Sequence, residues 1–205
     1  MATDTKFLTR QATVRATTKE MVKNRQAEFV ISSEAVDSFD TVFKIDGWDL
    51  ASYERNPIVV YQHRLLSDDP DNIIGTSTIR FENKEMIAVV TFEDAKTNPK
   101  AEKIMQKVYN NTLRMASVGF KPLEYRYGIE ANGEDPKVLY FTKTELREWS
   151  IVASGSNPDA LKRNQETLEN IRQEAAKDIP VIPSEDPKIK KRSAFEAQIL
   201  INKNK

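Results

Sequence analysis

The sequence predicts an α+β fold that is mostly strand, with one central helix. Short runs rich in β-branched and aromatic residues begin at Ala27 and recur to about residue 153, and this is strand composition. Two of these runs, 73–81 and 86–92, are joined by the polar segment ENKE, which favours a hairpin. The strongest helix pattern follows this hairpin, at 98–109.

The bulk composition fits one domain with tails and excludes several classes of partner. A chain of 205 residues suits one ordinary domain of about 100 to 150 residues plus tails. Its 31 basic residues balance 31 acidic ones, so no overall field draws it to nucleic acid or to an anionic membrane. No apolar run approaches the roughly 20 residues that span a bilayer, and the N-terminus lacks the apolar stretch of a secretory signal. We therefore expect a soluble intracellular protein with no membrane partner and no specific nucleic-acid partner.

The sequence divides into an arm, a domain and a tail. Residues 1–26 are polar and show no apolar period, so we predict a mobile arm with at most partial helix. The domain is expected to cover 27–163. The segment 164–205 is expected to begin as a polar helix and to end as a disordered tail, because 178–192 combines three prolines with dense charge.

Ahead of the predicted helix, strands are expected at 27–31, 41–45 and 56–62, and Pro57 should mark the start of the third. In the hairpin the second strand, 86–92, is expected to be the more buried one, because it is more continuously apolar.

The predicted helix has a defined start, a defined end and one apolar face. Asn98 is a suitable N-cap and Pro99 takes the first helical position. The Asn110-Asn111 pair ends it. Its buried face should consist of Ala101, Ile104, Met105 and Val108. After it, with turns at Gly128 and at Asn132-Gly133, strand patterns resume at 115–120, 124–129, 138–146 and 148–153.

The absence of cysteine and the presence of one histidine limit the chemistry. Without cysteine there is no disulfide framework, no thiol nucleophile and no thiolate metal site. A typical zinc site takes several His or Cys ligands, so we predict no metal and no cofactor. Nucleophilic catalysis would have to use Ser, Thr or Lys.

His63 is a candidate general base. It closes the run IVVYQH, where a strand end presents its side chain at the rim of a sheet. A neutral imidazole there can accept a hydroxyl proton near physiological pH. The alternative is a surface histidine with a satisfied hydrogen bond. The loop that follows contains Asp68, Asp69 and Asp71, which fit a solvated turn better than a calcium site.

Ser117 is a candidate nucleophile. It lies in MASVGF, where small neighbours let a substrate backbone approach, and Gly119 permits backbone N–H groups to turn toward an oxyanion. The alternative is an ordinary small strand residue. Its surroundings do not match the Gly-x-Ser-x-Gly elbow, which disfavours the α/β-hydrolase fold.

Glu148 is a candidate orienting acid. On a strand it shares one face with Ser150, while Trp149 and Ile151 share the other. A carboxylate on a strand that continues into apolar residues needs a partner, and a histidine ring N–H is a natural one. Glu145, which alternation puts on the opposite face, is the competing carboxylate.

The order YQH, a helix, SVGF, and ELREWSIV followed by NPDAL resembles the prohead (capsid-maturation) serine proteases of tailed bacteriophages. The similarity covers roughly residues 27–163 and includes FKIDGWDLASYERNPIVVYQH and the pair Ile74-Gly75. The chain departs from that family's pattern in VASGS before Asn157-Pro158 and in its Lys-Ile-Asp-Gly approach to the glycine.

This resemblance implies a compact β-barrel-like core related to the herpesvirus assemblins. It implies a Ser–His catalytic pair, with Ser117 as nucleophile, His63 as base and Glu148 as the third residue. The expected partners are the precursor of the major capsid protein, with its scaffold or delta region, and the chain itself, which would be cut after about Arg163. The family leaves room for a homo-oligomer, and the expected location is inside the procapsid in the host cytoplasm.

Two other classes of function stay open at this point. One is a scaffold or capsid-assembly factor that keeps the fold without cleaving, with residues 159–205 docking to capsid protein. The other is a hydrolase acting on a small ester.

Overall fold

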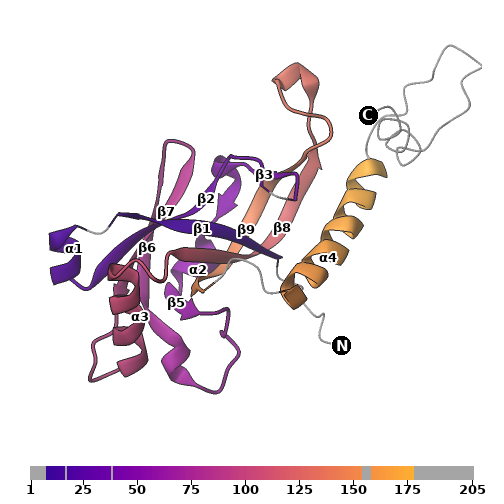
Figure 1. The fold of residues 1–205 in the computed structure, drawn as a ribbon. Coiled ribbons are helices and arrows are strands. Elements are labelled where there is room, and N and C mark those ends of the chain that lie inside the picture. Colours follow the sequence, from indigo (N-terminus) through magenta and orange to yellow (C-terminus); the bar gives the residue numbers. More distant parts are fainter. Residues whose placement is uncertain (1–7, 17, 38, 154–157, 178–205) are drawn as a thin grey trace, which may run out of the picture.

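The computed structural model describes residues 8–16, 18–37, 39–153 and 158–177 (Figure 1). Over these residues the fold is mixed α+β and mostly strand, and the sheet curls into a half-barrel with few helices around it, so the predicted fold class is confirmed at this level. The strands are β1 (Leu8–Ala16), β2 (Gln26–Ser33), β3 (Thr41–Phe43), β4 (Trp48–Asp49), β5 (Ile58–Tyr61), β6 (Ile73–Glu82), β7 (Glu85–Phe92), β8 (Met115–Tyr127) and β9 (Leu139–Val152). The helices are α1 (Lys19–Lys23), α2 (Ala51–Glu54), α3 (Pro99–Tyr109) and α4 (Pro158–Lys177), and short 3-10 turns lie at Ile45–Gly47, Pro70–Asn72 and Glu130–Asn132.

All the strands belong to one sheet, whose order brings distant parts of the chain together. The order is β3-β9-β5-β6-β7-β2-β1-β8. The last strand, β8, also pairs with β9, so β9 has both β5 and β8 as neighbours. β3, β4 and β5 run parallel to β9, whereas β8 is antiparallel to it. Strands β5, β9 and β8 therefore lie side by side, and they carry the three candidate residues or lead directly to them.

The first strand corrects the predicted division at residue 26. Leu8–Ala16 is a strand that pairs β2 on one side and β8 on the other, so it belongs to the sheet and not to an arm. Its residues 8–13 lie opposite 115–120 of β8. The prediction failed because residues 8–16 are mostly polar and carry no apolar period, and their partners in β8 lie far away along the chain. Residues 1–7 lie outside the described part of the chain.

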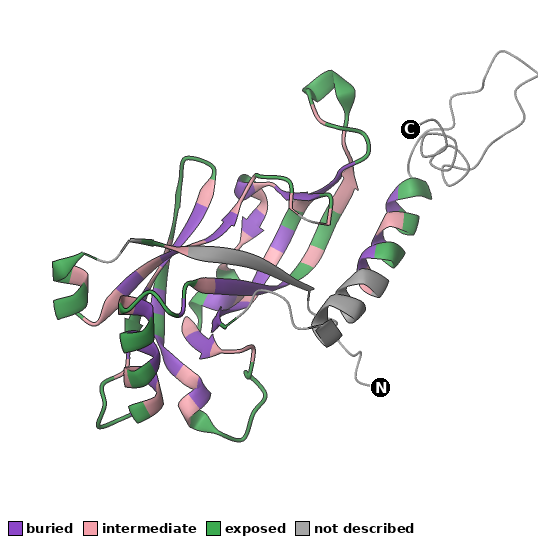
Figure 2. Cartoon of the chain, viewed as in Figure 1, coloured by how far each residue is buried: buried purple, intermediate pink, exposed green. Residues whose placement is uncertain are grey.

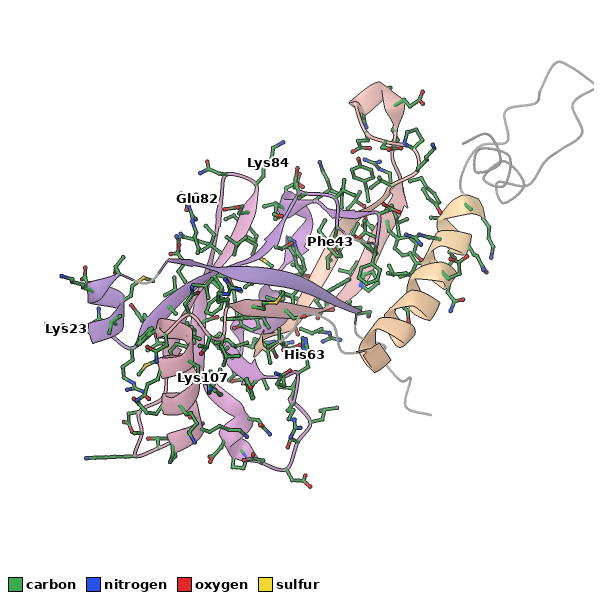
Figure 3. The ribbon with its side chains drawn as sticks, in the orientation of Figure 1. Lys23, Phe43, His63, Glu82, Lys84 and Lys107 are labelled. Carbon is green, nitrogen blue, oxygen red and sulfur yellow. The ribbon has the colours of Figure 1, made fainter. Side chains whose placement is uncertain are left out.

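The predicted hairpin and helix are confirmed. β6 and β7 are joined at Asn83 and Lys84, whose φ angles of 49° and 62° form a tight two-residue turn; Figure 3 labels Lys84 there. β7 is the more buried strand. In α3 the side chain of Asn98 accepts a hydrogen bond from the backbone N–H of Ala101 at 2.9 Å. Its buried residues are the predicted four, Ala101, Ile104, Met105 and Val108.

The later strand patterns form two long strands instead of four short ones. β8 and β9 pair along their whole lengths, with register shifts that absorb the interruptions seen in the sequence. The turn between them, which contains Gly133 with a φ of 72°, projects from the body of the molecule (Figure 1).

Helix α4 corrects the boundary at residue 163, because that residue lies inside the helix. Leu168, Ile171 and Ala175 are buried in the main core cluster, and α4 contacts β8 and β1. The predicted helix to about Lys177 is confirmed, whereas the predicted disordered tail, 178–205, lies outside the described residues. None of the helices in the described part of the chain is long and apolar enough to cross a membrane.

The core lies on the concave side of the curled sheet. Figure 2 shows buried residues concentrated on the strands and exposed ones on the turns and on the outer sides of α1 and α3. Trp149 is fully buried and its ring lies 5.5 Å from that of Phe29, measured between centroids. Trp149 therefore fixes one face of β9, and its neighbours Glu148 and Ser150 point to the other.

Candidate active site

His63 lies in a tight turn directly after β5 (Figure 3). Gln62 and His63 both adopt left-handed backbone conformations, with φ angles of 59° and 56°. Few non-glycine residues do so, and such strain persists only where the surroundings hold it. Here the N–H of Gln62 donates to the carbonyl of Ile151 at 3.1 Å, and the N–H of Arg64 donates to the carbonyl of Tyr61 at 3.3 Å. The turn therefore aims the imidazole back over the sheet.

His63 and Glu148 are in direct contact. Nδ1 of the imidazole lies 2.5 Å from Oε1 of the carboxylate. Because an ionised carboxylate can only accept a hydrogen bond, we assign the proton to Nδ1. The other ring nitrogen, Nε2, is then left as the hydrogen-bond acceptor, which is the form that can take a proton from a hydroxyl.

Ser150 holds both members of this pair. Its Oγ donates to Oε2 of Glu148 at 2.8 Å and accepts the backbone N–H of His63 at 3.1 Å. Ser150 is fully buried, and Glu148 is 7% exposed. Burying a carboxylate is costly unless it is paired and hydrogen-bonded, and here both of its oxygens have partners.

Ser117 lies on the neighbouring strand, on the same side of the sheet. It is opposite Ser150 in the β8–β9 register and is 2% exposed. Its neighbours Ala116 and Val118 join the core, so by alternation Ser117 faces away from the core, toward the side that His63 and Glu148 occupy. Within the described side chains no hydrogen bond joins Ser117 to His63. Opposed side chains on paired strands have Cβ atoms about 4.5–5.5 Å apart, so Ser117 lies directly beside the contacts of Ser150.

Gly119 leaves the space that Glu148 fills. The two residues are opposite each other in the register, and a Cβ on Gly119 would lie 2.4 Å from Oε1 of Glu148. Besides the expected role in directing backbone N–H groups, Gly119 has a spatial role, because only a residue without a side chain leaves room for the carboxylate of Glu148 over β8.

A β-bulge next to Glu148 changes which face of the sheet Glu145 and Glu148 occupy relative to each other. Gly119 pairs Glu148 and Phe120 pairs Leu146, so Arg147 is left without an opposite residue. The shift resets the alternation, and Leu146 and Trp149, three positions apart, both join the core. Glu145 and Glu148 are therefore not on opposite faces. They differ in their contacts, since Glu145 pairs with Arg147 at 3.1 Å whereas Glu148 contacts His63.

The acidic loop after His63 forms part of a surface turn. Asp69 caps the turn Pro70–Asn72 by accepting the N–H of Asp71 at 3.0 Å, and it pairs with Lys100 at 2.8 Å. The hydrogen bond from Lys100 lowers the pKa of Asp69 below its usual value. The described residues contain no group of three or more His, Asp or Glu side chains that could hold a metal ion.

No protein-family model, no curated protein and no solved structure matches this chain in the comparisons that we made.

The structure brings all three predicted site residues to one side of strands β5, β9 and β8. Sequence reasoning did not assign a role to Ser150 or the spatial role of Gly119. In the sequence, the one indication of a role for Ser150 is its position two residues after Glu148, which places both side chains on the same face of a strand. The contact of Ser150 with the backbone of His63 could not be read from the sequence, because it joins residues 87 positions apart.

Proposed function

We propose that this chain is a serine endopeptidase of the prohead-protease type, with Ser117 as nucleophile, His63 as general base and Glu148 as orienting acid. The observation that carries the proposal is the 2.5 Å contact between Nδ1 of His63 and Glu148, beside a serine on the next strand. A carboxylate, an imidazole and a hydroxyl in this order are the parts of a catalytic triad. The curled, mostly-β fold and the order of the motifs support the barrel-like fold of that family.

The proposed chemistry is acyl transfer. Nε2 of His63 takes the proton of Ser117 while Oγ forms a bond to a peptide carbonyl carbon, and the tetrahedral oxyanion then collapses. The imidazolium gives the proton to the leaving amine, which departs as the C–N bond breaks. Water repeats the sequence on the acyl-enzyme and releases the carboxylic acid. Throughout, Glu148 holds Nδ1–H and stabilises the imidazolium.

The burial of Ser117 bears on the class of substrate. Because Ser117 as a residue is only 2% exposed, a substrate reaches its hydroxyl after a local opening of the structure around it. We propose that the substrates are the scaffold or delta region of the major capsid protein precursor and the chain's own tail, cleaved inside the procapsid in the host cytoplasm. Confinement there raises the effective concentration, so tight binding is not required.

The rival function is a capsid-assembly factor that does not cleave. A structural role does not require an imidazole bonded to a buried carboxylate, whereas a general base does require a partner that fixes its tautomer. This observation favours the protease.

The test uses the full chain co-expressed with the capsid precursor, and treatment of the purified chain with a fluorophosphonate, which adds to activated serines. We expect the wild type to shorten the precursor and to gain one adduct, located at Ser117 by peptide mass spectrometry. Ser117→Ala should do neither. The matched control is Ser32→Ala, since Ser32 is a buried serine whose hydroxyl has no hydrogen-bond partner among the described residues, and this variant should retain both activities.

If the wild type promotes assembly without shortening the precursor and takes no adduct, the chain is an assembly factor. If Ser117→Ala still processes the precursor, the nucleophile is another residue.

A further inference from the structure

We infer that Ser150 is a positioning residue that sets both the tautomer and the orientation of His63. The inference rests on the proposed function for its effect on catalysis, but its structural part can be tested independently. Ser150 does not reach the reacting atoms through any contact that the structure describes. It acts through Glu148 and through the backbone of His63.

The two contacts of Ser150 use its hydroxyl both as a donor and as an acceptor. A serine hydroxyl has one proton to donate and lone pairs to accept. The proton goes to Oε2 of Glu148 at 2.8 Å, and a lone pair receives the N–H of His63 at 3.1 Å. A single oxygen thus joins the carboxylate, which belongs to β9, to the turn that follows β5.

This double contact fixes the carboxylate. Oε1 of Glu148 contacts Nδ1 of His63 and Oε2 contacts Ser150, so rotation of the buried carboxylate would break two hydrogen bonds. With the carboxylate fixed, the proton of the imidazole stays on Nδ1, and Nε2 stays available toward Ser117.

The same contact holds the strained turn. His63 has a φ of 56°, in the left-handed region that few non-glycine residues adopt. Its own N–H has Ser150 as its partner, and the neighbouring N–H of Gln62 is held by Ile151. Loss of the Ser150 hydroxyl therefore removes the direct anchor of His63 and half of the support of Glu148.

A purely structural role for Ser150 makes a different prediction. If the hydroxyl served only to satisfy a buried carboxylate, its removal would lower stability without changing the state of the imidazole. The chain offers a matched case in Ser77, a buried serine on the core side of the sheet. Its Oγ accepts from Trp149 Nε1 at 2.9 Å and bonds the hydroxyl of Tyr53 at 2.8 Å.

The experiment uses the full chain and takes advantage of its single histidine. Nitrogen-15 spectra of the imidazole report which ring nitrogen carries the proton, with no overlapping histidine signals, and hydrogen exchange reports the protection of the His63 amide. Both are measured for the wild type, Ser150→Ala, Ser150→Thr and Ser77→Ala, together with kcat and KM on the capsid precursor and with the Tm.

In Ser150→Ala we expect the His63 amide to lose its protection from exchange and the imidazole to become a mixture of tautomers. We expect kcat to fall about 10- to 100-fold with little change in KM, which is the scale seen when a group that orients a functional histidine is lost. Ser150→Thr, which keeps a hydroxyl, should restore the tautomer and part of the rate. Ser77→Ala should lower the Tm and leave both histidine readouts unchanged.

The inference is overturned if Ser150→Ala keeps the amide protection and the tautomer of the wild type. It is also overturned, without any variant, if the wild-type imidazole carries its proton on Nε2 or if the His63 amide exchanges freely. If the wild type cleaves nothing while both histidine readouts follow the expectation, the proposed protease activity is wrong and the positioning role of Ser150 stands.

Discussion

The carboxylate of Glu148, on β9, fills the space that a side chain at Gly119, on β8, would occupy. The position where a Cβ of Gly119 would lie is 2.4 Å from Oε1 of Glu148, and that same oxygen lies 2.5 Å from Nδ1 of His63. A side chain at position 119 and the contact between His63 and Glu148 therefore exclude each other. The side chain of Glu148 is hydrogen-bonded at both carboxylate oxygens, so moving it away from a new methyl group would break these hydrogen bonds.

Gly119→Ala should accordingly damage the site more than the fold. The added methyl displaces the carboxylate by about 1 Å, and we expect cleavage of the capsid precursor to slow at least about 100-fold, as misplacements of that size do. Gly133→Ala is the control, because Gly133 has a φ of 72° with nothing within 4 Å, so the change strains an exposed turn and should leave the rate unchanged. Equal rates for Gly119→Ala and the wild type would show that the contact is dispensable.

If the proposed protease activity is correct, Glu148→Gln should leave a folded protein whose kcat falls by up to about 10⁴-fold, because an amide can present its N–H to Nδ1 and favour the wrong tautomer. Glu145→Gln removes only the pair with Arg147 and should change kcat less than about twofold, in line with the small worth of partly exposed ion pairs. The rates of the two variants are compared on one substrate. A damaging Glu145→Gln beside a silent Glu148→Gln would transfer the role to Glu145, and two silent variants would leave a Ser–His dyad.

The chain should trim itself within its C-terminal segment while the domain survives. The sequence alone put this cut after about Arg163, but α4 is helical to Lys177 and buries Leu168, Ile171 and Ala175, and proteases bind extended chain. We therefore expect the cut after Lys177, in the proline-rich stretch. Intact masses of wild type and Ser117→Ala are followed over time. A full-length wild type that still cleaves capsid precursor, or equal shortening of both proteins, would make the segment a permanent docking element.

Alkaline pH should destabilise the domain through Tyr53. Burial raises the pKa of this phenol from its ordinary value of 10.0 to about 12, while the hydrogen bond with Ser77 opposes the shift. The folded state thus favours the neutral phenol, so its contribution to stability is complete below about pH 10 and is lost as pH rises toward 12. Urea unfolding is measured at pH 9 and pH 11.5. Between these pH values the free energy of unfolding should fall more in the wild type than in Tyr53→Phe, by up to about 2 kcal/mol. Parallel pH profiles would mean that Tyr53 titrates normally.

The elements that could be predicted from the sequence are those whose determinants are local. Helix α3 begins at Asn98 because that side chain caps it, and the β6–β7 hairpin turns at Asn83, a residue type that adopts positive φ readily. In both cases a few neighbouring residues carry the whole physical cause.

The elements that could not be predicted depend on pairing with other strands and not on a pattern in their own residues. In β1 only Leu8 and Val14 are large and apolar, so the strand has no pattern of its own and exists because β2 and β8 pair with it on both sides. For the site, residue types pointed to His63, Ser117 and Glu148. The relation of Gly119 to Glu148, however, depends on a bulge that skips Arg147, and alternation cannot reveal a skipped residue.

The contact between His63 and Glu148 spans 85 positions, and the strand of Ser117 lies between β1, near the start of the chain, and β9, at the end of the domain. During synthesis, a chain that has emerged only as far as β8 has the imidazole and the hydroxyl but no carboxylate to orient them. The pair forms only after β9 has left the ribosome and has paired with both β5 and β8, and such non-local pairing is slow. Because of this strand order, the three side chains come together only after the whole domain has been synthesised and the sheet has closed.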